Sequence, residues 1–169
     1  MLLQSTYDRQ MIPVNLLPMV QSQYQVSLYE EDFALWIEET TVRLEAREFE
    51  QIDLENVIRE FSALGRSERR ELCDRSHILL CHILKRVYIN NSDNNRAWEL
   101  TIREQRRHLK LLFEDSPSLR NNWQQTFDRL HHDARSEVAQ DYPNTRFPDD
   151  WQFDRDLDAL MLKAFWLSD

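Results

Sequence analysis

Apolar side chains recur at every third or fourth position from residue 27 onward, which is the period of a helix with one buried face. This pattern predicts five main helices and a short last one, and no segment alternates as a strand would. The positions expected to face a common core are Tyr29, Phe33, Trp36, Ile37, Thr40 and Leu44 in the first helix, Leu54, Val57, Ile58, Phe61 and Leu64 in the second, Leu72, Leu79, Leu80, Ile83 and Val87 in the third, Trp98, Ile102, Leu109, Leu112 and Phe113 in the fourth, Leu119, Trp123, Phe127, Leu130, Ala134 and Val138 in the fifth, and Leu157, Leu160, Met161 and Phe165 in the last. We therefore expect an all-α fold, an antiparallel helical bundle that forms one domain over residues 27–169.

Polar residues stand where most of these helices should begin. The predicted N-terminal caps are Ser27 with Glu30 as a capping box, Asp53, Ser67, Ser116 followed by Pro117, and Asp154. The run from Asn90 to Asn95 is entirely polar and predicts a loop between the third and fourth helices.

Gly65 is the only glycine in the chain. It follows the second apolar stripe, so it is expected to end that helix as a left-handed C′ residue with positive φ. Ser67 would then cap the next helix at once, and the two stripes would face the same core. A chain with one glycine also cannot form the Gly-rich loops that bind phosphates and dinucleotides.

Residues 1–26 differ from the rest of the chain. Pro13 and Pro18 interrupt an apolar stretch with almost no charge, a pattern typical of an extended arm. The arm is expected to lie on the bundle or on a second subunit, so a homo-oligomer joined through residues 1–26 is one interpretation. The start of the sequence lacks the features of a secretory leader.

The composition is that of a globular protein, with 41% hydrophobic and 30% charged residues among 169. No apolar run approaches the ~20 residues that span a bilayer, so no membrane association is expected. Cys73 and Cys81 would lie about 12 Å apart on one helix, too far for a disulfide with each other. The expected location is therefore the cytoplasm.

The net charge of −9 is unevenly distributed, because residues 62–110 are basic and both flanking regions are acidic. The candidate binding residues are Arg96, Arg103, Arg107 and Lys110, which form a stripe opposite the apolar face of the fourth helix, and Arg66, Arg69 and Arg70 beside Gly65. Three interpretations stay open: a solvated or internally paired face, with Glu99 paired to Arg103; an acidic surface of a protein partner; and nucleic acid, which the acidic overall charge disfavours.

Several short motifs resemble a bacterial family known as domain of unknown function twenty-nine. They are Tyr29 with Asp32-Phe33 and Trp36, the runs Asp53–Asn56 and Leu64–Arg70, Leu79-Leu80 with His82 and Leu84-Lys85, Trp98 with Thr101-Ile102 and Glu104–Arg106, and Ser116–Leu119. The resemblance implies a compact helical fold and no established activity, ligand or partner. The chain departs from the family at Arg86, where an aromatic residue is usual, and in the Asn-rich run that follows.

Two Asp-x-x-His pairs, Asp74/His77 and Asp128/His131, have the spacing of metal ligands on helices. Both carboxylates are expected to point away from the core, so no metal site is predicted there. Cys73, His77 and Cys81 follow one another at four-residue intervals, but at most two of them could share an ion. Another helix would have to supply the remaining ligands, with His108, His131 and His132 as candidates.

No nucleophile, base and orienting group stand in a recognisable pattern, so no catalytic residue and no cofactor are predicted. The leading hypothesis is a non-enzymatic protein-interaction or regulatory module. The alternatives are a metal-dependent or acid–base enzyme that uses His77, His131 or His132, and nucleic-acid binding through the basic stripe.

Overall fold

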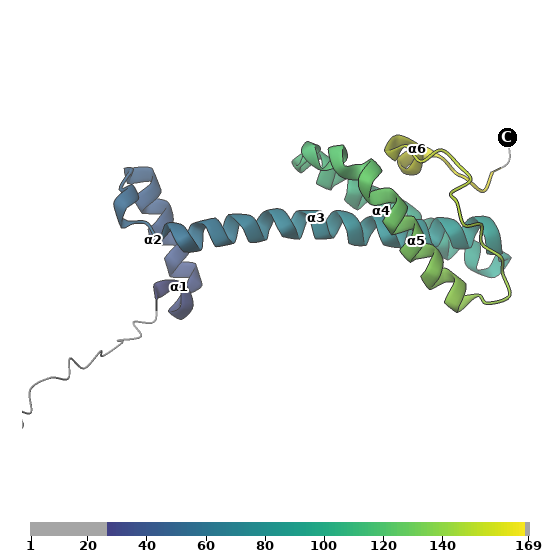
Figure 1. Ribbon diagram of the computed structural model, residues 1–169, viewed down its shortest axis with the longest axis horizontal. Helices are drawn as coiled ribbons and strands as arrows, with labels where there is room; N and C mark the ends of the chain where they lie inside the picture. Colours follow the sequence, from purple (N-terminus) through teal and green to yellow (C-terminus); the bar gives the residue numbers. More distant parts are fainter. Residues whose placement is uncertain (1–26, 168–169) are drawn as a thin grey trace, which may run out of the picture. The chain divides into compact units, whose positions relative to one another are not determined.

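The computed structural model describes residues 27–167 (Figure 1). Every regular element within these residues is helical, which confirms the all-α class. The chain divides into two compact units, Met1–Asp53 and Leu54–Asp169. The predicted arm of residues 1–26 lies outside the described residues.

The described part of the first unit contains α1 (Leu28–Glu31), α2 (Phe33–Ala46) and the 3-10 turn η1 (Phe49–Gln51). Asp32 separates α1 from α2 because its backbone is extended and its side chain accepts a hydrogen bond from the amide of Leu35, at 3.0 Å. Ser27 precedes α1 but makes no side-chain capping bond. The predicted first helix is therefore two helices, with the effective cap at Asp32.

Half of the predicted apolar face of this region is exposed, at Phe33, Ile37 and Leu44. Tyr29, Phe33 and Trp36 contact one another through their rings, with centroids 5.0–5.7 Å apart. Within α2, only Trp36 and Thr40 are buried. Arg47 ends α2 in the left-handed conformation, with φ of 61°.

The second unit is organised by α3, one helix that runs from Leu54 to Leu84. The predicted break at Gly65 is wrong, since no described glycine has positive φ and the helix continues through this position. One glycine inside a helix costs only about 1 kcal/mol relative to alanine. The helix-forming residues on both sides, among them Leu64, Arg66 and Arg69, outweigh that cost.

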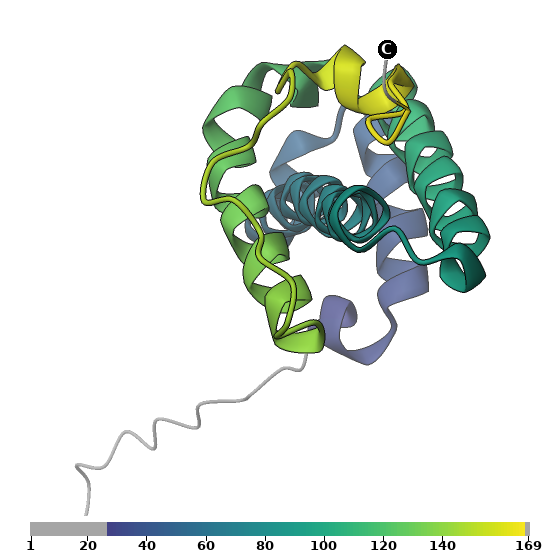
Figure 2. The ribbon, with the colours of Figure 1, turned by 90° about the vertical axis from the view of Figure 1, so that its right-hand side faces the viewer.

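The second half of α3 lies in the core of this unit. Figure 2 looks along α3 and shows α4 (Ser92–Asp115) and α5 (Trp123–Asp141) on opposite sides of it, with α6 (Leu157–Leu162) on a third side, at the top of the view. Both α4 and α5 contact α3. The fully buried side chains include Leu79, Leu80, Ile83 and Leu84 of α3, Ile102 and Leu109 of α4, Phe127 and Val138 of α5, and Leu160 of α6.

The connection between α3 and α4 is shorter than predicted. Lys85–Ile89 form a turn of π-helix (η2), which ends at Asn90 in the left-handed conformation. The side chain of Asn91 accepts from the amide of Asp93, so α4 begins at Ser92. The Asn-rich run is therefore mainly the first turn of α4, because an asparagine side chain supplies its cap.

Two other predicted caps have different roles. Ser116 precedes the 3-10 segment η3 (Pro117–Asn122), and its hydroxyl donates to Glu68 of α3, at 2.5 Å, instead of capping. Asp156 caps α6, whereas Asp154 accepts from the amide of Asp156. In the described residues, no helix is long and apolar enough to cross a membrane.

The continuity of α3 leads to a testable prediction about Gly65. A Cβ built there would lie 3.8 Å from the nearest guanidinium nitrogen of Arg69, an ordinary contact. Gly65→Ala should therefore raise the free energy of unfolding by about 0.5–1 kcal/mol, measured by urea denaturation. The matched control is Ser62→Gly, an exposed site on the same helix, which should lower it by about 0.5 kcal/mol. A loss of stability in Gly65→Ala would contradict the helical conformation.

Candidate functional site

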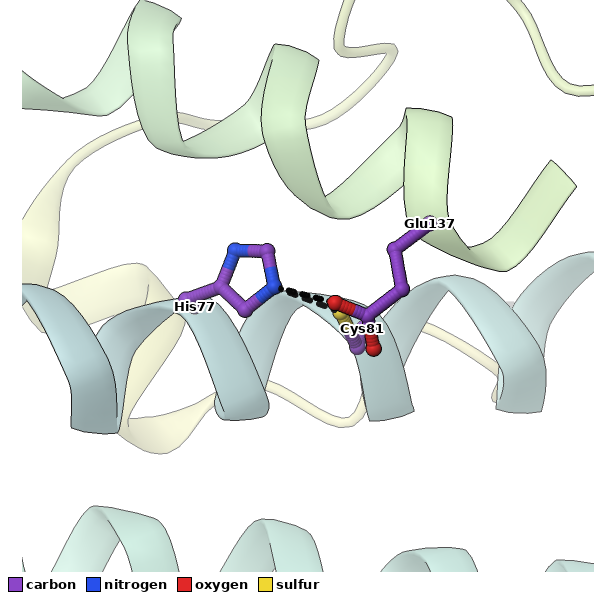
Figure 3. A group of neighbouring side chains, drawn as sticks. All are labelled: His77, Cys81 and Glu137. Carbon is purple, nitrogen blue, oxygen red and sulfur yellow. Dashed lines mark hydrogen bonds and ion pairs between the residues drawn. The ribbon is translucent and has the colours of Figure 1, made fainter. Parts of the chain in front are cut away.

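Three side chains with metal-binding chemistry converge between α3 and α5. His77 and Cys81 lie one turn apart on α3, and Glu137 reaches them from α5 (Figure 3). Cys81 is buried, with 2% of its surface exposed, whereas Glu137 is exposed. The cluster thus has a buried sulfur at its base and a carboxylate at its solvent side.

The donor atoms are close to one another. Nε2 of His77 lies 2.8 Å from Oε2 of Glu137 and 3.6 Å from Sγ of Cys81. All three donor atoms lie within 4.8 Å of each other. The Cys81 thiol also points to the carbonyl oxygen of Ala134, at 3.8 Å. The cluster is held by one turn of α3 and by the packing of α5 along it.

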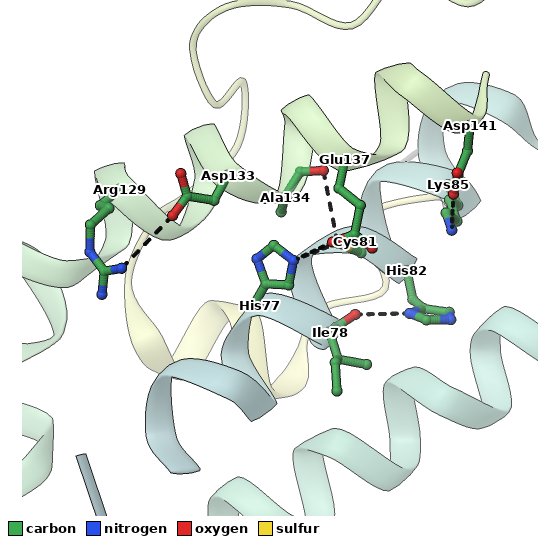
Figure 4. A network of polar contacts seen from close by, with 10 residues as sticks. All are labelled: His77, Ile78, Cys81, His82, Lys85, Arg129, Asp133, Ala134, Glu137 and Asp141. Atoms are coloured by element: carbon green, nitrogen blue, oxygen red, sulfur yellow. Dashed lines mark hydrogen bonds and ion pairs between the residues drawn. The ribbon is translucent and has the colours of Figure 1, made fainter. Parts of the chain in front are cut away.

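Ion pairs lie on both sides of the cluster along α5 (Figure 4). Asp141 pairs with Lys85 at 3.2 Å, and Asp133 pairs with Arg129 at 3.8 Å. Glu137 stands between these two acids, one helical turn from each. Its neighbours are an imidazole and a thiol instead of a lysine or an arginine.

Burial decides the chemistry of the Cys81 thiol. Desolvation, together with the negative charge of Glu137, raises the pKa of Cys81 to about 12. The thiol is therefore protonated at neutral pH and is not an activated nucleophile. His82, on the next position of α3, donates Nδ1–H to the carbonyl of Ile78 at 2.9 Å, and burial lowers its pKa.

The His77 and Cys81 spacing was visible in the sequence, but Glu137 was not among the candidate partners. It comes from α5, and only the packing register of α3 against α5 brings it to the cluster. Cys73, the third member of the sequence pattern, faces Arg129, whose guanidinium donates to its sulfur at 3.5 Å. Among the described residues, His77, Cys81 and Glu137 are the only such group of three.

The other predicted histidine motifs do not converge. His131 is buried, its ring stacked on Phe127 and edge-on to Trp151, with centroids 6.1 and 5.4 Å away. Asp128 points away and pairs with Arg155 at 3.2 Å. His132 is exposed. His131 therefore packs among the aromatic side chains of the core.

The predicted basic residues are all exposed: Arg66, Arg69 and Arg70 on α3, and Arg96, Arg103, Arg107 and Lys110 on α4. The predicted pair of Glu99 with Arg103 is wrong, because Glu99 binds Arg86 at 2.6 Å. Arg86 also lies over the ring of Trp166, 5.2 Å from its centroid. Arg86 therefore links α4, through Glu99, to the segment after α6, through Trp166.

The seven basic residues do not share one recess. Arg69 lines a hollow of about 300 Å³ with Leu119 and Thr126, whereas Arg70 lines another of about 280 Å³ with Glu71 and Asp74. Among the described residues, no carboxylate pairs with Arg66, Arg69 or Arg70. These three arginines are thus exposed cations without an ion-pair partner among the described side chains, although Glu71 and Asp74 lie in the same hollow as Arg70.

Arg106 donates to the carbonyl oxygen of Lys163 at 2.5 Å. Its Nε has no partner in the described structure. Burial lowers the pKa of Arg106. The guanidinium therefore links α4 to the segment after α6 through backbone, not through a salt bridge.

The first half of α3 exposes an apolar stripe that the sequence predicted to be core. No residue of α3 before Leu72 is buried. The stripe consists of Leu54, Ile58, Phe61 and Leu64, each between 52% and 68% exposed. The prediction failed because it placed a turn at Gly65, which would have folded this stripe back onto the core.

Comparison with known proteins identifies a family but no function. The family model described as "Domain of unknown function DUF29" matches residues 28–166. The match therefore continues well beyond Leu119, the last residue of the motifs found in the sequence. No curated protein and no solved structure matches the chain.

The position of His131 predicts a pH dependence of stability. Burial lowers its pKa from 6.5 in the folded state, and the charge of Arg135 lowers it further. The unfolded chain then binds more protons, so the free energy of unfolding should fall as pH decreases below 6.5. His131→Phe keeps an aromatic ring and should flatten part of this slope in urea denaturation between pH 7 and 5, while half-buried His82, whose pKa is also lowered, retains its own share.

His132→Gln is the control for His131→Phe, since it removes an exposed imidazole from the adjacent position. An unchanged slope in His131→Phe would show that the His131 ring is protonated equally in both states and is not buried as described.

Proposed function

This chain belongs to the DUF29 family, whose function is unknown, and we propose that it is a non-enzymatic protein-interaction module that binds a second copy of itself through the first half of α3. The observation that carries this proposal is the exposed apolar stripe of Leu54, Ile58, Phe61 and Leu64. The free cysteines Cys73 and Cys81 favour the cytoplasm as its location.

The stripe has the geometry of a helix-pairing surface. Its members are four, three and three residues apart, so they occupy one face about 120° wide and about 15 Å long. Large apolar side chains scattered singly on a surface need no explanation, but a continuous face of this kind usually binds a partner. A second amphipathic helix is the partner that fits such a face.

The order of charges along this segment favours an antiparallel pair of identical helices. At its beginning, Glu55 pairs with Arg59 of the same helix, at 3.6 Å. At its end, Arg66, Arg69 and Arg70 are interspersed with Glu68 and Glu71. A parallel pair would bring the two arginine clusters together, whereas an antiparallel pair keeps them apart. A twofold axis produces this arrangement, which is the commonest symmetry of homodimers.

The length of the stripe limits the affinity. Stable interfaces bury about 1,200–2,000 Å², and two helix segments about 15 Å long bury less. The proposed association is therefore reversible, with a dissociation constant in the micromolar range.

The surroundings of Cys81 and His131 favour a binding role over a catalytic one. The Cys81 thiol is protonated at neutral pH, and His131 is enclosed by aromatic rings. Neither of these two groups is therefore placed to act as an activated nucleophile or a general base.

Sedimentation equilibrium tests the proposal directly. The wild-type chain should change from monomer to dimer between about 1 and 100 μM. Phe61→Glu would place a carboxylate in the centre of the paired stripe, where burial of a charge is costly. It should raise the dissociation constant at least tenfold, which is about 1.4 kcal/mol.

Leu111→Glu is the matched control, because Leu111 is a similarly exposed apolar residue on α4. It should dimerise as the wild type does. A wild-type chain that stays monomeric throughout this range would contradict the proposal, as would equal weakening by both variants.

A further inference from the structure

We propose that His77, Cys81 and Glu137 form a binding site for a divalent transition-metal ion, zinc by its donor set, with water in the fourth position. This site lies on the second half of α3 and on α5, apart from the stripe that carries the proposed interaction. The inference therefore does not depend on dimer formation.

The distance between the two α3 donors matches a tetrahedral zinc centre. Zinc binds a cysteine sulfur at about 2.3 Å and a histidine nitrogen at about 2.0–2.1 Å, which places the two ligand atoms about 3.6 Å apart in tetrahedral geometry. The observed separation of Sγ of Cys81 from Nε2 of His77 is 3.6 Å. These two ligands need no rearrangement of the backbone.

Glu137 needs only a small movement. A carboxylate oxygen and a histidine nitrogen on one zinc ion lie about 3.3 Å apart, and here they are 2.8 Å apart in a hydrogen bond. The Glu137 side chain is 57% exposed and can withdraw by about half an ångström without disturbing the core. The ion would replace one hydrogen bond with two coordinate bonds.

Asp133, Glu137 and Asp141 form a row of acidic side chains along α5, and Glu137 is the one that does not pair with a lysine or an arginine. Asp133 and Asp141 are both neutralised by a basic side chain, at 3.8 and 3.2 Å. Glu137, between them, faces two side chains that can coordinate a metal (Figure 4). Its one basic neighbour, His77 at 2.8 Å, is charged only when protonated, and a bound dication would supply a permanent positive charge there.

The charges balance on metal binding. The Cys81 thiol, which now donates to Ala134, releases its proton to solvent and binds as a thiolate. His77 binds through Nε2 as the neutral tautomer with its proton on Nδ1. The dication, one thiolate and one carboxylate then sum to zero, which suits a half-buried site.

The donor set also selects the class of metal. A thiolate and an imidazole favour zinc over magnesium and calcium, which prefer oxygen ligands. Three protein ligands leave one position open, and the adjacent carboxylates are occupied by their own ion pairs. Water therefore completes the coordination.

Cobalt titration of the full reduced chain is the primary test, because Co²⁺ occupies tetrahedral zinc sites and is visible spectroscopically. We expect one equivalent of Co²⁺ to give a thiolate-to-metal charge-transfer band in the near ultraviolet, and Zn²⁺ to abolish it by displacement. Zn²⁺ should also raise the melting temperature of the wild-type chain, since it binds only the folded site.

The variants assign the ligands. Cys81→Ser should abolish the charge-transfer band, and Glu137→Gln, an exposed and nearly isosteric change, should weaken binding at least tenfold while the protein folds normally. Cys73→Ser is the matched control, since it removes a thiol from the same helix four residues from His77, and it should retain the band.

Three results would overturn the proposal: no cobalt band at micromolar metal, a band that persists in Cys81→Ser, or an unchanged affinity in Glu137→Gln. Phe61→Glu should bind metal as the wild type does, so failure of the dimer and failure of the metal site are distinguishable.

Discussion

The structure of the second unit depends on the burial of the second half of α3 between α4 and α5. Leu79, Leu80, Ile83 and Leu84 are four nearly consecutive side chains that are almost completely removed from solvent. Such a helix is apolar on most of its circumference because it has neighbours on more than one side. The position of α3 then determines which residues of α4 and α5 it contacts.

The same helix is buried in one half and exposed in the other, and this follows from its continuity. A turn at Gly65 would have allowed the first stripe to fold back onto the core. Because α3 instead continues for 31 residues, Leu54, Ile58, Phe61 and Leu64 lie beyond the part that α4 and α5 cover. The exposure of these side chains is thus a consequence of backbone conformation and not of a polar sequence.

Periodicity predicted the fold class and most of the core, because the faces of α4 and α5 are long and strongly amphipathic. It failed where one local signal competed with another. Gly65 is a residue typical of helix ends, yet strong helix formers surround it. Asp32 begins α2 inside the predicted first helix, and Asn91 begins α4 within the run that was predicted to be a loop. The sequence indicated two ligands of the candidate metal site, because His77 and Cys81 share one face of α3. It did not indicate Glu137, because the register in which α5 packs against α3 is not encoded in the spacing of residues along either helix.

Continuity also relates the two proposed sites physically. Phe61 and His77 are separated by about 24 Å along one uninterrupted helix, so rotation of α3 about its axis at one end changes the face presented at the other. Burial of Leu79, Leu80, Ile83 and Leu84 between α4 and α5 already fixes that rotation in the second half of the helix. The core therefore sets the direction of the exposed stripe, and metal binding at His77 and Cys81 leaves it unchanged.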